Sequence, residues 1–221
     1  IAAGMLEVDE GDVAYQAGRF SVPGTDIAPL TFGSVARMAY VGHKLPDGME
    51  PGLDETVFYD PKGMGSPSGI HMAYVEVDPE TGIVEILDYV DVDDAGTIIN
   101  PLLAAGQIHG GVVQGIAQAL HEDVSYDPDT GQLMTGSLLD YAVPRAEHVP
   151  SIRSVFQQTP SPTNPIGVKG IGESGSIAAP PCMVHAVLDA LSPFGIKHLD
   201  MPMTPPRVWS AVQNARAGES R

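Results

Sequence analysis

The residues best suited to chemistry lie in one glycine-rich stretch, residues 165–181. Four glycines surround a single carboxylate there, that of Glu173, and small or apolar residues follow it. Glycine lets the backbone take positive φ angles and approach a ligand closely. A carboxylate on such a loop is either a structural hydrogen-bond acceptor or a general base, and the spacing alone leaves both interpretations open.

A helix should follow this loop and hold it in place. Residues 177–191 are mostly apolar and predict a buried helix. We expect Ser174 or Ser176 to cap it, with Pro180 and Pro181 in its first turn, where proline is tolerated. The proline-rich residues 160–165 cannot form regular structure and lead into the loop.

A second glycine-rich segment, residues 102–122, predicts the longest helix. Its four glycines would each destabilise a helix interior by about 1 kcal/mol relative to alanine, so they indicate close packing against another backbone or a bulky cofactor. Gln107 and Gln114 lie on one face of this helix. Each is either an ordinary satisfied amide or a group that meets the edge of a heterocycle.

Residues 70–77 and 83–92 predict a β-hairpin with its turn at 78–82. The acidic segment 93–101 follows, and it is either an Asx-type loop or a turn that faces a ligand. Residues 124–126 and 132–135 predict a second hairpin.

The remaining elements are shorter. We expect a helix over residues 31–41 with Thr31 as its N-cap, and a last helix over 207–217 with Val208, Trp209 and Val212 facing inward. Short strands are expected at 56–59, 152–159 and 196–199. The whole pattern predicts an α+β fold of short mixed or antiparallel sheets packed with about four helices, and residues 1–221 show no long linker.

Composition excludes several classes of protein. A formal net charge of −17 argues against binding to nucleic acid or anionic membranes. The single cysteine, Cys182, excludes a disulfide framework and cysteine-based metal sites. His109 and His121 have no partners at metal-ligand spacing, so we interpret both as structural or surface residues. With no signal peptide and no long apolar run, a cytoplasmic protein without a membrane span is expected.

Four ordered motifs carry a resemblance to a known family. They are Asp93-Asp94-Ala95-Gly96 with Asn100-Pro101, residues 106–115, Thr135-Gly136-Ser137 with Asp140-Tyr141, and residues 167–173. Together they resemble the C-terminal part of the molybdopterin-binding large subunit of molybdenum hydroxylases, the xanthine dehydrogenase and aldehyde oxidase superfamily. The carbon monoxide dehydrogenase large-chain branch is the most similar.

The resemblance implies specific roles for a few residues. Glu173 matches the family's general base, and Gln107 matches a glutamine that hydrogen-bonds the cofactor near the metal. The backbone of Lys169, Gly170 and Ile171 matches the loop that lines the pterin. The implied cofactor is molybdenum held by molybdopterin, in bacteria often as the cytosine dinucleotide. The substrate would be carbon monoxide, an aldehyde or an N-heterocycle.

Two departures limit what the resemblance implies. Ala95 stands where this branch often has cysteine. The chain is also only about a third to a quarter of a complete large subunit, so we expect a fragment that by itself lacks the cofactor and is inactive. Its expected partners are the N-terminal part of the large subunit, an FAD-binding medium subunit and an iron–sulfur small subunit, together with homo-oligomerisation. The alternative is a non-catalytic assembly or protein-interaction module that retains the fold.

Overall fold

The computed structural model describes residues 1–219, and these divide into two compact units, Ile1–Asp60 and Pro61–Arg221. The first unit contains helix α1 (Ala2–Leu6), an antiparallel sheet of β1 (Ala14–Gln16), β2 (Arg19–Ser21) and β3 (Leu30–Thr31), and helix α2 (Phe32–Ala39). The predicted cap of α2 is confirmed, because Thr31 Oγ1 accepts a hydrogen bond from Ser34 N at 3.1 Å.

The second unit is built on a three-stranded sheet in the order β4-β5-β6. β4 (Ser68–Val77) and β5 (Val84–Asp94) form the predicted antiparallel hairpin, and β6 (Ile152–Phe156) lies parallel to β5. Parallel neighbours need a crossover connection. Helix α3 (Pro101–Leu120) supplies it, together with a long loop and the 3₁₀ turn Ala146–His148.

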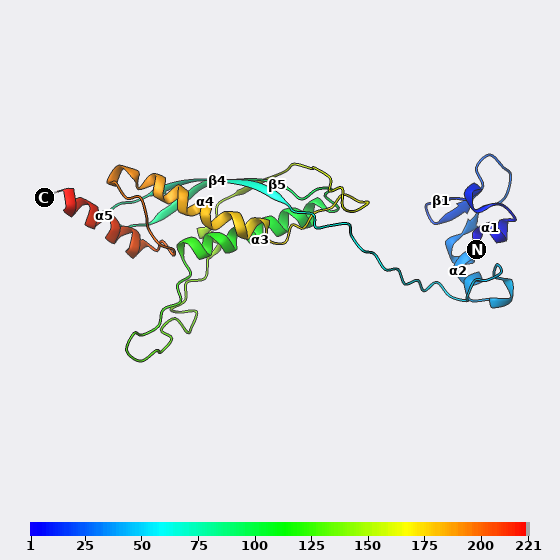
Figure 1. Cartoon of the computed structure of the whole chain (residues 1–221), viewed down its shortest axis with the longest axis horizontal. Helices are drawn as coiled ribbons and strands as arrows, with labels where there is room; N and C mark the ends of the chain where they lie inside the picture. Colours follow the sequence, from blue (N-terminus) through cyan, green and yellow to red (C-terminus); the bar gives the residue numbers. More distant parts are fainter. Residues whose placement is uncertain (220–221) are drawn as a thin grey trace. The chain divides into compact units, whose positions relative to one another are not determined.

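Helices α3 and α4 (Ser174–Ala190) pack side by side against one face of this sheet (Figure 1). Asn100 caps α3, since its Oδ1 accepts from Leu102 N and Leu103 N, and Pro101 takes the first helical position. Helix α5 (Pro205–Glu219) buries Val208 and Val212. The fully buried core of this unit includes residues of β5 and of all three helices, among them Tyr89, Ile108, Ile116, Met183, Val187, Val208 and Val212.

The predicted start of α4 is wrong. The helix begins at Ser174 with Glu173 as its N-cap, so neither serine caps it, and Ser176 Oγ instead donates to the Glu173 carbonyl at 3.2 Å. Pro180 and Pro181 therefore lie inside the helix. Neither has an N–H, so α4 lacks two internal hydrogen bonds. Close packing of Pro180 on Gly115 of α3 accompanies this interruption.

Three smaller predictions also fail. Residues 56–59 and 196–199 form no strand, because neither segment meets a partner strand. A 3₁₀ turn, Ser192–Phe194, precedes the second segment. Trp209 is 44 % exposed and so does not face inward with Val208 and Val212, which are fully buried.

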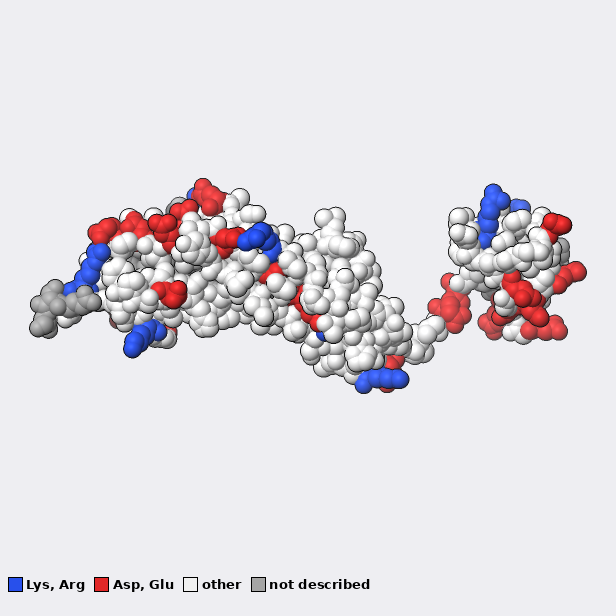
Figure 2. All heavy atoms as spheres, turned by 90° about the horizontal axis from the view of Figure 1, so that it is seen from above, with Lys and Arg blue, Asp and Glu red and all other residues white. Residues whose placement is uncertain are grey.

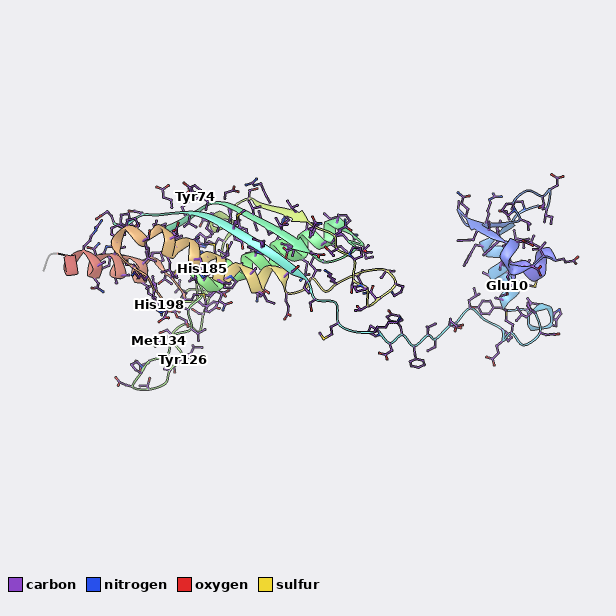
Figure 3. The ribbon with its side chains drawn as sticks, turned by 45° about the horizontal axis from the view of Figure 1, so that its top comes forward. Glu10, Tyr74, Tyr126, Met134, His185 and His198 are labelled. Atoms are coloured by element: carbon purple, nitrogen blue, oxygen red, sulfur yellow. The ribbon has the colours of Figure 1, made fainter. Side chains whose placement is uncertain are left out.

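The second predicted hairpin is reduced to one bridge between Tyr126 and Leu133. It lies on a projecting loop, where Tyr126 and Met134 are both exposed (Figure 3). The α+β prediction as a whole is confirmed by five α-helices and two small sheets within residues 1–219. None of the helices described combines the length and the apolar character needed to cross a membrane.

Candidate active site

Glu173 is the last residue before α4, and its side chain is exposed. Its backbone carbonyl accepts a hydrogen bond from Ile177 N at 2.9 Å, which anchors the residue at the start of the helix. Within residues 1–219, no lysine or arginine pairs with its carboxylate. The carboxylate is therefore presented at the surface and is not used as a structural acceptor.

Gln107 of α3 reaches the same loop. Its Nε2 donates to the carbonyl oxygen of Gly172 at 3.1 Å, and Gly172 directly precedes Glu173. The two residues of the contact are 65 positions apart in the sequence, and the contact fixes the Glu173 loop on α3. Neither Gln107 nor Gln114 lines the cavity that adjoins Glu173.

Lys169 lies at the other end of this loop and is held by the end of β5. Its Nζ lies 2.8 Å from Asp94 Oδ2, and its backbone N donates to Ala95 O at 2.9 Å. Asp94 Oδ1 also accepts from Gly96 N and Thr159 N, so the segment after β5 is an Asx-type loop. The Lys169 hydrogen bond, followed by that of Gly96, holds the pKa of the Asp94 carboxyl well below its usual range.

A cavity of about 610 Å³ adjoins Glu173. Residues 64–69 form one wall, residues between 170 and 178 form the other, and Asp93 of β5 contributes to the lining. Of the predicted loop residues, Gly170 lines the cavity, whereas Lys169 points to Asp94 and Ile171 packs against the core. A turn facing a ligand was one of two alternatives for residues 93–101, and Asp93 does line the cavity, whereas sequence reasoning missed Ser174 and residues 64–69 as cavity residues.

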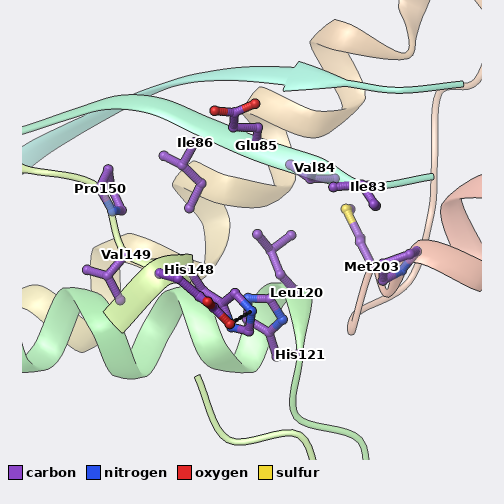
Figure 4. Close-up of a pocket in the computed structure, with 12 residues that line it drawn as sticks. Ile83, Val84, Glu85, Ile86, Leu120, His121, His148, Val149, Pro150 and Met203 are labelled. Carbon is purple, nitrogen blue, oxygen red and sulfur yellow. Dashed lines mark ion pairs between the residues drawn. The ribbon is translucent and has the colours of Figure 1, made fainter. Parts of the chain in front are cut away.

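A second cavity of about 590 Å³ shares no residue with the first. It lies between the start of β5, the end of α3 and residues 147–150 (Figure 4). The rings of His121 and His148 stack there with centroids 4.7 Å apart. Glu147 Oε1 lies 3.8 Å from His148 Nε2. Burial, followed by the charge of His148, lowers the pKa of His121.

The described residues contain no group of three or more His, Cys, Asp or Glu side chains placed to hold a metal ion. The glycine-rich loop and the exposed carboxylate of Glu173 line one cavity of this α+β unit.

Comparison with known proteins gives the family. Residues 1–150 match the molybdopterin cofactor-binding domain, and the chain belongs to this family. It is 40 % identical over 213 residues to the carbon monoxide dehydrogenase large chain of Hydrogenophaga pseudoflava, covering 96 % of the chain and 26 % of that protein. It is 42 % identical over 214 residues to the nicotine 6-hydroxylase large subunit of Paenarthrobacter nicotinovorans, with the same coverage.

The fold is also that of a solved relative. The structure of reconstituted CO dehydrogenase from Oligotropha carboxidovorans superposes with a TM-score of 0.86 at 34 % identity, covering 98 % of this chain and 27 % of the other. The chain thus spans about a quarter of the length of the relatives that it matches.

The residues around the cavity fit a pterin. Ser174 lines it, and its Oγ is buried without a hydrogen-bond partner, so this hydroxyl has a hydrogen bond to give or accept. Gly170 and Gly172 have no atom within 4 Å of the position that a Cβ would take, so a planar group can approach their backbone. Hydroxyl and backbone groups of this kind suit the polar edge of a pterin ring.

Proposed function

We propose that this chain forms part of the active site of a molybdenum hydroxylase, with Glu173 as its general base. The observation that carries the proposal is the free Glu173 carboxylate on the wall of a cavity whose loop is fixed by Gln107. A general base must be accessible and must not be neutralised by a cation, and Glu173 meets both conditions.

The cofactor would supply the metal and its redox chemistry. The role of this chain is to bind and orient it: Ser174 offers a hydroxyl, and Gly170 and Gly172 offer open backbone. Gln107 keeps the loop at a fixed distance from α3. Glu173 accepts a proton during transfer of oxygen from water to the substrate.

Substrate and partners are proposed by analogy with the relatives. One of these is named for carbon monoxide and another for nicotine, so a small substrate such as carbon monoxide, an aldehyde or an N-heterocycle is proposed. The residues that select among these lie outside the chain. The proposed partners are the rest of the large subunit, an FAD-binding medium subunit and an iron–sulfur small subunit, in a cytoplasmic oligomer that uses the cytosine dinucleotide form of the cofactor.

The test is Glu173→Gln in the complete enzyme. Glutamine keeps the shape but cannot take up the proton, so we expect kcat to fall by about 10²–10⁴-fold with the molybdenum content unchanged. Glu147→Gln, at the other cavity, is the matched control and should retain activity. Near-normal turnover of the Glu173 variant would show that Glu173 is not the general base.

The isolated 221-residue chain gives a second prediction. Because it spans about a quarter of its relatives, most of the surface that would enclose the cofactor is contributed by other residues. We expect the purified chain to contain far less than one molybdenum per molecule by elemental analysis and to show no turnover. Stoichiometric molybdenum would refute this.

A further inference from the structure

Polar side chains occupy the face of β5 that packs against the helices. Tyr89, Asp91 and Asp93 alternate along the strand, and they are 0 %, 0 % and 2 % exposed. Burying carboxylates in a core is costly, and well-packed apolar residues often serve stability equally well. Two buried carboxylates beside a buried tyrosine on one face of β5 therefore point to a role other than stability.

His71 of β4 joins two of these residues. Its Nδ1 lies 2.8 Å from the Tyr89 hydroxyl, and its Nε2 lies 3.3 Å from Asp93 Oδ2. The tautomer that donates from Nε2 to the Asp93 carboxylate leaves Nδ1 to accept from the Tyr89 hydroxyl. The ring is held at both nitrogens, which fixes its orientation and that of the carboxylate.

Asp91 lies between these partners and makes a separate contact. Its Oδ2 accepts from Ser154 Oγ of β6 at 2.8 Å, whereas its Oδ1 is buried without a partner. Burial raises the pKa of Asp91. Asp91 therefore belongs to the buried cluster but does not reach the cavity lining.

Asp93 connects the cluster to the Glu173 cavity. It belongs to the cavity lining, and its Oδ1 packs directly behind Gly69 of the opposite wall segment, leaving no room for a Cβ on that glycine. The backbone carbonyl of Asp93 accepts from Gln157 N at 3.0 Å, so the main chain is anchored too. The wall at Gly69 thus rests on a carboxylate whose position depends on His71.

We propose that His71 and Asp93 are positioning residues for the Glu173 cavity, with Asp93 supporting the Gly69 wall and His71 fixing Asp93 through its Nε2 hydrogen bond. Tyr89 completes the arrangement by fixing the other ring nitrogen. The inference rests on the proposed function of the cavity. The contacts that define it lie wholly within this chain.

The first test uses the 221-residue chain and needs no cofactor. Asp93→Asn removes the charge, and His71→Phe removes the hydrogen bond to Asp93, whereas His71→Gln keeps an amide donor near the Nε2 position. We expect the first two to shift the backbone amide NMR signals of Gly69, Gly170 and Ser174, and His71→Gln to restore them largely. Asp88→Asn is the matched control, because Asp88 lies on the same strand but pairs at the surface with Arg153.

The second test uses the complete enzyme. A displaced wall should lower kcat by about tenfold or more in Asp93→Asn and His71→Phe at unchanged molybdenum content, with His71→Gln closer to the parent. If either variant fails to fold, Tyr89→Phe, which removes one hydroxyl, should still lower kcat and shift the same signals.

The proposal is overturned if Asp93→Asn and His71→Phe, or Tyr89→Phe in their place, leave both the cavity signals and kcat at the level of Asp88→Asn. This result is separate from a failure of the proposed function. If the proposed function itself is wrong, Glu173→Gln retains turnover, whatever the NMR signals of the cavity residues show.

Discussion

Three carboxylates of the second unit lie in three different environments, and each environment suits a different task. Glu173 is exposed and has no basic partner in the described part of the chain. Asp94 is held by Lys169 and two backbone N–H groups. Asp91 is fully buried, and one of its oxygens is unpaired. Of the three, only Glu173 lines the cavity.

The ion pair between Asp94 and Lys169 gives a prediction about pH. The pKa of Asp94 is lowered in the folded protein, so its carboxylate stabilises the fold above the unfolded pKa of about 3.9. This contribution is lost as the pH falls towards the folded pKa. We expect Asp94→Asn to lower the melting temperature at pH 6, and the difference from the parent to be smaller at pH 3.

Thermal unfolding followed by circular dichroism across this pH range measures the effect. Asp88→Asn is the control, since its ion pair with Arg153 is exposed and exposed pairs contribute little. A difference between Asp94→Asn and the parent that stays constant from pH 6 to pH 3 would contradict the linkage.

At the scale of the elements, α3 and α4 pack through glycines. A Cβ on Gly111 would lie 2.8 Å from Ser176 N, and one on Gly115 would lie 2.6 Å from the Ala179 Cβ. Gly106 and Gly110 of the same helix have nothing within 4 Å. The sequence left two explanations for these glycines, and close approach to a second backbone accounts for Gly111 and Gly115.

This contrast predicts opposite effects for the same substitution on one helix. Gly115→Ala forces its methyl group against Ala179 and Pro180, so it should destabilise the chain by about 1–3 kcal/mol. Gly110→Ala meets open space and gains helix propensity, so it should stabilise the chain by about 0.5–1 kcal/mol. Urea unfolding measures both, and equal effects of the two variants would refute this view of the packing.

The elements that the sequence predicted well depend on local signals. The β4–β5 hairpin has its turn residues, and α2 and α3 have their caps within a few positions of their starts. The strands expected at 56–59 and 196–199 failed because pairing depends on distant segments. Glu173 could be selected from its local motif. The contact between Gln107 and the Glu173 loop, and the part of the cavity wall formed by Asp93, join residues far apart in the sequence and therefore required coordinates.

At the scale of the whole molecule, the described surfaces are strongly apolar in places. Ile70, Met72 and Tyr74 alternate along β4, and each is at least 60 % exposed; Tyr74 lies on the face of the sheet away from the helices (Figure 3). Much of the visible face of this unit carries no charged residue (Figure 2). An exposed apolar stripe such as that of Ile70, Met72 and Tyr74 is typical of an interface, in keeping with relatives about four times as long.

The division into two units gives the last prediction. All members of the main buried cluster, from Tyr89 to Val212, lie within residues 61–221, and so do the strands and helices that contribute them. The hydrophobic contribution to stability follows the area buried, so this core does not need residues 1–60. We expect residues 61–221 produced alone to protect the amides of α3 and α4 from hydrogen exchange as strongly as the whole chain does. Gly115→Ala should weaken that protection equally in both proteins. If residues 61–221 without any substitution lose the protection, the first unit contributes to this core.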